Sequence, residues 1–197
     1  MLMLPDYRVR QRDFLLELSR AITARLDLSD VLKLALKASV IMLGGQIGLI
    51  ALRASDGQFY VRAASGVDSD KISVINQQLQ VLTAIAIEHG IEAEAFNEKL
   101  GEMAKAVDPK MNHAIALPLI FAKEPLGMMI VFRDYRSEAT ANDFQILRSF
   151  ADQAAIAVHN AQLYERINTE RHRLEAILEH NADGVMILAA ELVILRF

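Results

Sequence analysis

The sequence predicts an α/β domain of the α+β kind, in which an antiparallel sheet lies between two layers of helices. Two pairs of apolar segments with turn-like connections, within 47–65 and 113–133, predict two β-hairpins. Helical segments precede, separate and follow these hairpins. The strands are almost continuously apolar, whereas a sheet with one wet face would alternate. Both faces of the sheet are therefore expected to be covered, which gives three layers.

The first part of the chain predicts a pair of helices. One opens at Pro5 and runs to about Leu26, with apolar residues on one face. The second is capped by a side chain within 27–30 (Asp27, Ser29 or Asp30) and ends at the glycine pair 44–45.

Two hairpins and two further helices complete the domain. The hairpin strands are expected at 47–53, 58–65, 113–121 and 126–133. An Asp-Gly dipeptide, which readily adopts positive φ, joins the first pair, and the loop 122–125 joins the second. Helices at 70–89 and 91–107 lie between the hairpins and end at Gly90 and at an Asp-Pro pair. They are expected to cover one face of the sheet, and the terminal helices the other.

The last helix is the most informative element. From Thr140 to His180 there is no Gly or Pro, and Thr140 with Asp143 forms a Thr-x-x-Asp start typical of a capped first turn. Such a helix is about 60 Å long at 1.5 Å per residue, so its second half is expected to protrude from the domain. The alternative is a long surface helix packed wholly on its own domain.

Alternating steps of four and three along this helix predict the seam of a two-stranded coiled coil. Two seam positions are polar, which weakens such a coil but restricts its register and partner number. The predicted seam consists of Ile156, Asn160, Leu163, Ile167, Glu170, Leu174 and Ile177. The expected partner is a second copy of the chain, because a stripe on a protruding helix needs to be covered.

Composition excludes several classes of function. The chain has no cysteine, which removes thiol nucleophiles, Cys-ligated zinc and thioether-linked chromophores, and fits a reducing, cytoplasmic setting. A net charge of -4 makes neither nucleic acid nor an anionic membrane surface an expected partner. No apolar run is long enough to span a membrane.

Several separated segments resemble the GAF domain, a sensory module of bacterial signalling proteins. The segment FRDYRSEATANDFQILRSFADQAAIAVHNAQLYERI is similar to the closing strand and helix of that family. The segment AIALPLIFAKEPLGMMIVF resembles the preceding hairpin, and ITARLDLSDVLKLAL and GLIALRASDGQFYVRAASG resemble the front half. Positions usually filled in the closing helix are Phe144, Leu147, Phe150, Ala151, Gln153, Ala154, Ala155, Ala157, Asn160, Ala161 and Leu163.

The end of the chain has a second likeness. LEAILEHNADGVMILAAELVILRF resembles the entry to a PAS domain. The expected organisation is an N-terminal helix extension at 1–11, a GAF-like domain at 12–165, a coiled-coil signalling helix at 166–180 and the truncated start of a PAS domain at 181–197. That last segment is expected to form a short hairpin or to be disordered.

The resemblance implies a regulatory module of a signalling protein, with a sensor histidine kinase as one candidate. Members bind small ligands, cyclic nucleotides, tetrapyrroles or metals, or serve as dimerisation and relay modules. In this chain the insert 70–107 reads as two helices, where many members have a strand and a long loop, and the cyclic-nucleotide phosphodiesterase signature has no counterpart. The sequence identifies no cofactor.

Few residues suggest chemistry. Tyr60 and Arg62 on a strand are candidates to meet an anionic ligand, although an exposed rim position is favoured. His113 is a candidate pocket residue, with a structural role favoured over haem or metal ligation. No histidine has a partner at metal-ligand spacing, and no catalytic constellation emerges.

These observations predict a non-catalytic, homodimeric sensory module that passes a conformational change through its last helix to a following PAS-like or output domain. The alternative is a ligand-independent dimerisation spacer with a filled core. An enzyme like the sulfoxide-reducing relatives is disfavoured, since those depend on cysteines.

Overall fold

The computed structural model describes residues 4–23, 27–134, 140–180, 187–188 and 194–196. The chain divides into two compact units, Met1–His159 and Asn160–Phe197, which are described one after the other.

The first unit contains a four-stranded antiparallel sheet with strand order β2-β1-β4-β3. The strands are β1 (Ile47–Arg53), β2 (Phe59–Ser65), β3 (His113–Phe121) and β4 (Glu124–Arg133). Each predicted hairpin forms, and the two are joined in the middle, where β1 pairs with β4. The two edges of the sheet are therefore β2 and β3.

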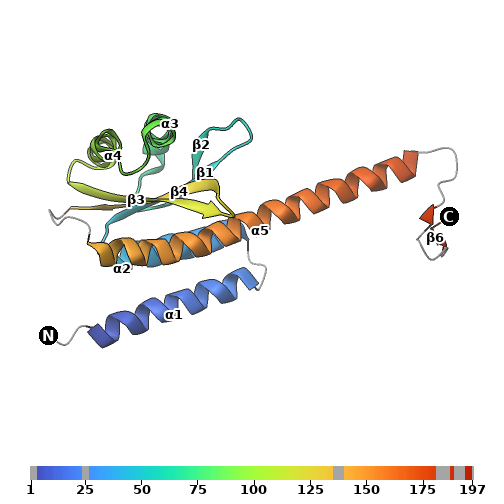
Figure 1. The fold of residues 1–197 in the computed structure, drawn as a ribbon, viewed down its shortest axis with the longest axis horizontal. Helices are drawn as coiled ribbons and strands as arrows, with labels where there is room; N and C mark the ends of the chain where they lie inside the picture. Colours follow the sequence, from blue (N-terminus) through green and yellow to red (C-terminus); the bar gives the residue numbers. More distant parts are fainter. Residues whose placement is uncertain (1–3, 24–26, 135–139, 181–186, 189–193, 197) are drawn as a thin grey trace. The chain divides into compact units, whose positions relative to one another are not determined.

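The helices are α1 (Leu4–Thr23), α2 (Leu28–Met42), α3 (Ile72–His89), α4 (Glu94–Val107) and α5 (Ala141–His180), with a short 3₁₀ turn at Ser69–Lys71. α3 and α4 lie on one face of the sheet, and α2 and the first part of α5 lie on the other, with α1 outside α2 (Figure 1). The predicted three-layer α+β architecture is confirmed.

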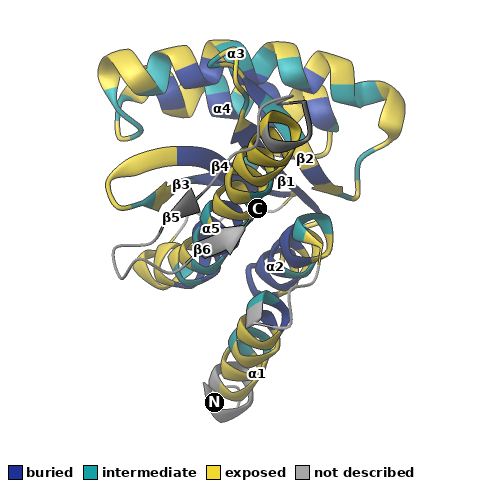
Figure 2. Ribbon diagram, turned by 90° about the vertical axis from the view of Figure 1, so that its right-hand side faces the viewer, coloured by how far each residue is buried: buried dark blue, intermediate teal, exposed yellow. Residues whose placement is uncertain are grey.

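Two apolar cores lie on either side of the sheet, and the strands supply both. Ala114 and Ala116 of β3 join the core under α3 and α4, whereas Ile115 and Leu119 join the core under α2 and α5. β4 is buried along eight consecutive residues. The buried inner faces and exposed outer faces of the helices are visible in Figure 2. The continuous apolar character of the strands thus reflects burial on both faces.

Local signals in the sequence set several element boundaries as predicted. Asp27 caps α2, where its carboxylate accepts the backbone N–H of Ser29 at 2.7 Å. Gly57 in the first hairpin turn and Gly90 after α3 have φ of 81° and 85°. Because glycine has no Cβ, it adopts these angles without steric cost.

The second hairpin turns more tightly than predicted. Its loop is only Ala122 and Lys123, both with positive φ, and Glu124 and Pro125 belong to β4. Such turns are usually marked by Asn-Gly, and Ala-Lys carries no such signal. Pro125 is tolerated because the pairing of β4 with β1 reaches only to Gly127, which leaves the proline beyond the central ladder.

The second unit contains the rest of α5 from Asn160 and a two-stranded antiparallel pair, β5 (Ile187–Leu188) and β6 (Ile194–Arg196). Of the segment 181–197, for which a short hairpin or disorder was expected, only these five residues are described. The other residues of 181–197, on which the PAS resemblance depends, lie outside the described residues.

Candidate functional site

A pocket of about 670 Å³ lies beside the edge strand β3. Its floor is a run of four β3 residues, Ala114–Leu117. One wall comes from α4 and the turn before it, and the other from the first turns of α5. The wall residues are Ile91, Glu92, Phe96, Asn97 and Leu100 on the α4 side and Ala141, Phe144, Gln145 and Arg148 on the α5 side. We call this site the β3 groove.

The β3 groove combines an apolar floor with a charged rim. Phe96 and Leu100 are buried, whereas Phe144 is 43% exposed although it is a large aromatic residue. Glu92 and Arg148 are exposed and stand on opposite walls. The volume falls within the range of about 300–1,000 Å³ that is usual for ligand sites. The groove therefore suits a ligand with apolar groups and charges of both signs.

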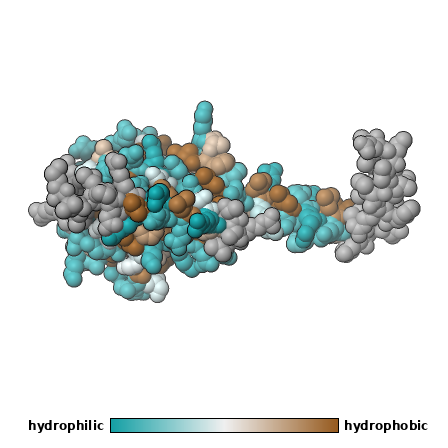
Figure 3. Space-filling model, turned by 90° about the horizontal axis from the view of Figure 1, so that it is seen from below, coloured by the Kyte–Doolittle hydropathy of each residue, from teal (hydrophilic) through white to brown (hydrophobic). Residues whose placement is uncertain are grey.

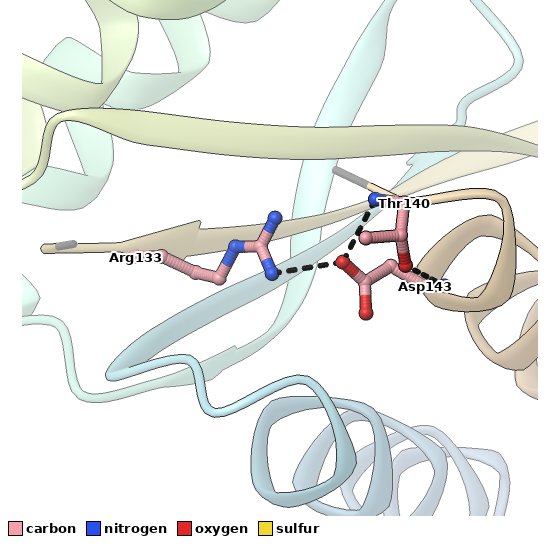
Figure 4. Close-up of polar contacts among 3 residues, drawn as sticks. All are labelled: Arg133, Thr140 and Asp143. Carbon is pink, nitrogen blue, oxygen red and sulfur yellow. Dashed lines mark hydrogen bonds and ion pairs between the residues drawn. The ribbon is translucent and has the colours of Figure 1, made fainter. Parts of the chain in front are cut away.

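A buried ion pair holds the start of α5 against the sheet. Arg133, at the end of β4, is 1% exposed, and its Nη1 donates to Asp143 Oδ2 at 3.1 Å (Figure 4). The same carboxylate oxygen accepts the backbone N–H of Thr140, and Thr140 Oγ1 accepts the N–H of Asp143 at 3.2 Å. The predicted capping box is thus present, and its acidic residue, Asp143, also links the helix to β4.

The sequence-predicted pocket residues lie elsewhere. Tyr60 is on β2, and its hydroxyl donates to Asp56 Oδ2 at 2.8 Å. Hydrogen bonds from the backbone N–H of Gln58 and from the Tyr60 hydroxyl lower the pKa of Asp56. The hydrogen bond to Asp56 in turn raises the pKa of Tyr60. Arg62 is exposed on β2. His113 is half-buried at the start of β3, next to the groove floor, but does not line the groove.

The other histidines in the described ranges are not gathered with further side chains that could bind a metal ion. The ring of His159 on α5 stacks on Phe121 at the end of β3, with centroids 3.9 Å apart. Across the described parts of the chain, no group of three or more His, Cys, Asp or Glu side chains is placed to hold a metal ion. Within those same parts, no helix is long and apolar enough to cross a membrane.

The predicted seam changes its surroundings along α5. Ile156 is half-buried, whereas Asn160 and Glu170 are exposed. The apolar seam residues beyond Asn160 are also exposed, each by about half of its surface: Leu163, Ile167, Leu174 and Ile177. We call these four residues the α5 stripe. Apolar atoms recur among hydrophilic ones along this part of the helix (Figure 3).

Comparison with protein families identifies the domain. The sequence profile of the GAF domain matches residues 25–159, which is more than half of the chain and includes every strand of the main sheet. The chain belongs to the GAF domain family. This confirms the resemblance seen in its closing helix and hairpins. No curated protein sequence matches the chain.

Solved GAF structures share the fold at low sequence identity. The GAF domain of an Acinetobacter phosphoenolpyruvate-protein phosphotransferase is 14% identical with a TM-score of 0.59, over 79% of this chain and 97% of that one. Residues 122 to 287 of a methyl-accepting chemotaxis protein are 18% identical with a TM-score of 0.56, over 75% and 98%.

A third similar structure carries a chromophore. The phycoerythrobilin-bound GAF domain of a cyanobacterial phytochrome is 15% identical with a TM-score of 0.57, over 78% of this chain and 96% of that one. These three likenesses show that the fold of the chain is the GAF fold.

The β3 groove was not predicted, because its walls come from segments that are distant in the chain. One signal was available: Pro118 cannot donate a hydrogen bond to a neighbouring strand, which marks β3 as an edge strand. Arg148 had no distinguishing pattern, since charged residues are ordinary on the outer face of a helix.

Proposed function

We propose that this GAF domain is a regulatory module of a signal-transduction protein, which senses a small ligand, works as a homodimer and transmits a conformational change through α5. Family membership supports the sensory part of this proposal. The exposed α5 stripe carries the dimerisation part, because a half-exposed row of four aliphatic side chains at heptad spacing is typical of a helix that pairs with another.

The β3 groove is the proposed input site, because one of its walls is α5 itself. A ligand that contacts Phe144 and Arg148 bears directly on the first turns of the helix that carries the stripe. The Arg133–Asp143 ion pair fixes the same turns to β4. Displacement of the first turns of α5 by a ligand would shift or rotate the helix. The α5 stripe would carry that change into a following domain, and the PAS-like segment is the proposed recipient.

Charge-introducing variants of the α5 stripe test the dimer. We expect L163K/I167K to convert a dimer into a monomer in sedimentation velocity, because paired lysines at a seam repel and lose apolar burial. Glu165→Lys, which lies outside the seam on the same helix, is the matched control and should remain a dimer. A dimer that survives the double substitution would show that another surface mediates association.

The polar seam residues provide a second test. Replacement of Asn160 with Leu and of Glu170 with Ile should tighten the dimer and reduce ligand-dependent change, because polar seam residues trade stability for a restricted register. Unchanged dimer stability and unchanged output would mean that these positions are not at an interface.

A ligand-independent dimerisation spacer is the second candidate. It is favoured by the tightly filled layer between the sheet and α3–α4, in which Leu79, Met103 and Phe132 are fully buried. Native mass spectrometry of the purified protein separates the two candidates. A dimer with additional bound mass supports sensing, and a bare dimer that binds no added ligand supports the spacer.

A further inference from the structure

We propose that the β3 groove binds a short peptide in extended conformation, which adds to the free edge of β3 as a fifth strand of the sheet. The proposal names the ligand class of the input site and therefore rests on the proposed sensory function. It is carried by a difference between the two edges of the sheet.

The β2 edge is covered by side chains of α3. Asn76 Oδ1 accepts the backbone N–H of Val61 at 2.9 Å. The side-chain amide of Gln80 accepts a hydrogen bond from the backbone N–H of Phe59 at 3.3 Å. It also donates one to the backbone carbonyl of Phe59 at 2.6 Å. Two side chains four residues apart on one helix thus occupy the backbone groups that another strand would use.

The β3 edge has no such cover. Among the described residues, no side chain hydrogen-bonds to the backbone of Ala114–Leu117, whose partner in the ladder is β4. The groove runs beside this stretch. Because exposed strand edges template the pairing of another chain, proteins usually block them. Here one edge is blocked by α3 and the other opens into a groove between two helices.

Pro118 defines which backbone groups point outward. Proline is tolerated in an edge strand where its nitrogen faces away from the neighbouring strand. Backbone N–H groups alternate in direction along a strand, so those of Ala114 and Ala116 also face away from β4. These two donors and their carbonyls are available to an added strand, and Pro118 ends the available stretch.

The residues in the walls of the β3 groove indicate which types of side chain the peptide carries. Successive side chains of an added strand point to opposite faces of the sheet. One set meets Phe96 and Leu100 on the α4 side, with Glu92 at the rim, and the other meets Phe144 and Arg148 on the α5 side. The groove therefore favours apolar residues at neighbouring positions, an acidic residue towards α5 and a basic residue towards α4.

Strand addition explains the shape of the site better than a compact ligand does. The four floor residues span about 13 Å at the rise of a β-strand. An extended peptide satisfies evenly spaced backbone groups along such a length, while alternate side chains enter pockets on either side.

The test uses a defined peptide probe, Ac-Thr-Val-Val-Glu-Lys-Thr-NH2, and two forms of it that are N-methylated at one or the other set of alternate amides. The backbone amides of the ¹⁵N-labelled full chain are followed by NMR titration to millimolar peptide. We expect saturable shifts at Ala114 and Ala116, and binding at least about tenfold weaker for one methylated form but not for the other, because only one set of peptide amides faces β3.

Protein variants provide an independent readout. Arg148→Glu should weaken binding of the probe several-fold. Lys37→Glu, an exposed charge reversal on α2 outside the groove, should leave binding unchanged. Ala116→Pro removes one outward backbone donor and should weaken binding of the probe further. The methylated peptides keep the test valid if this variant fails to fold.

Three results would overturn the inference: no saturable binding, equal effects of both methylated forms, or shifts centred on β2 instead of β3. Protection of the Ala114 and Ala116 amides from hydrogen exchange in the dilute free protein would also overturn it. Failure of this inference is distinguishable from failure of the proposed function. If another small molecule binds the groove while the peptide does not, only the strand-addition inference is lost.

Discussion

Arg133 and Asp143 show how one pair of side chains links the sheet to α5. The guanidinium side chain is 2% exposed and the carboxylate 18%, so the pair is largely shielded from water. Asp143 also completes the capping box with Thr140. A buried pair need not add net stability over an apolar pair, but loss of one partner is costly because the other charge stays buried.

Replacement of Asp143 with Ala should lower the free energy of unfolding by about 3 kcal/mol, because it removes both a cap and a charged partner of the buried Arg133. Urea unfolding measures this loss. Thr140→Ala is the matched control, since it removes only the cap and should cost about 1 kcal/mol. Equal losses in the two variants would mean that the ion pair contributes nothing beyond the cap.

At the scale of elements, α3 acts on β2 through side-chain hydrogen bonds as well as through apolar packing. Ile75, Leu79 and Leu82 face the core, while Asn76 and Gln80 reach the strand edge. The helix therefore covers both a face and an edge of the sheet. In the described part of the chain, no side chain hydrogen-bonds to the backbone of Ala114–Leu117 on β3, and this asymmetry between the two edges underlies the proposed groove function.

Gln80→Ala should destabilise the domain by about 1–2 kcal/mol, because it leaves the N–H and carbonyl of Phe59 without their side-chain partner. The amide of Phe59 should also exchange faster with solvent. Gln77→Ala, an exposed position on the same helix, should change stability by less than about 0.5 kcal/mol. Unchanged exchange at Phe59 would show that the edge is protected by other means.

At the scale of the whole molecule, all the buried core residues of the described chain lie before Asn160. The two apolar cores draw on every strand of the main sheet and on the first turns of α5. The GAF domain therefore contains its own folding determinants, and the α5 stripe lies in the other unit.

A chain ended after His159 should unfold cooperatively with nearly the stability of the full chain, because both cores are retained. It should also be monomeric if the α5 stripe mediates association. Urea unfolding and sedimentation velocity on the same preparation measure both properties. A dimer of the shortened chain would place the interface on the first unit, for example on α1.

Local chemistry made much of the fold predictable. The Thr-x-x-Asp start, the Asp27 cap, the Asp-Gly turn and Gly90 act within a few residues, and each is found where the sequence placed it. The loop 122–125 was predicted, but its tight two-residue form at Ala122 and Lys123 was not, because nothing in those two residues favours positive φ. The pairing of β3 with β4 imposes it.

The candidate site was much less predictable. Tyr60 and Arg62 were chosen for their chemistry, but they lie on β2, outside the groove on the opposite edge of the sheet. Strand order decides which residues meet, and a propensity or a motif carries no information about it. The groove requires α4, β3 and α5 to come together across a long stretch of chain.

The sequence by itself determined the element order, the two-sided burial of the sheet, the GAF resemblance and the heptad spacing of α5, because periodicity and capping are properties of neighbouring residues. Only the tertiary structure decided which strands are edges, that α3 covers one of them, and that the other opens into a groove. Those features arise from contacts between segments distant in sequence, where packing and strand pairing, rather than local preference, set the geometry.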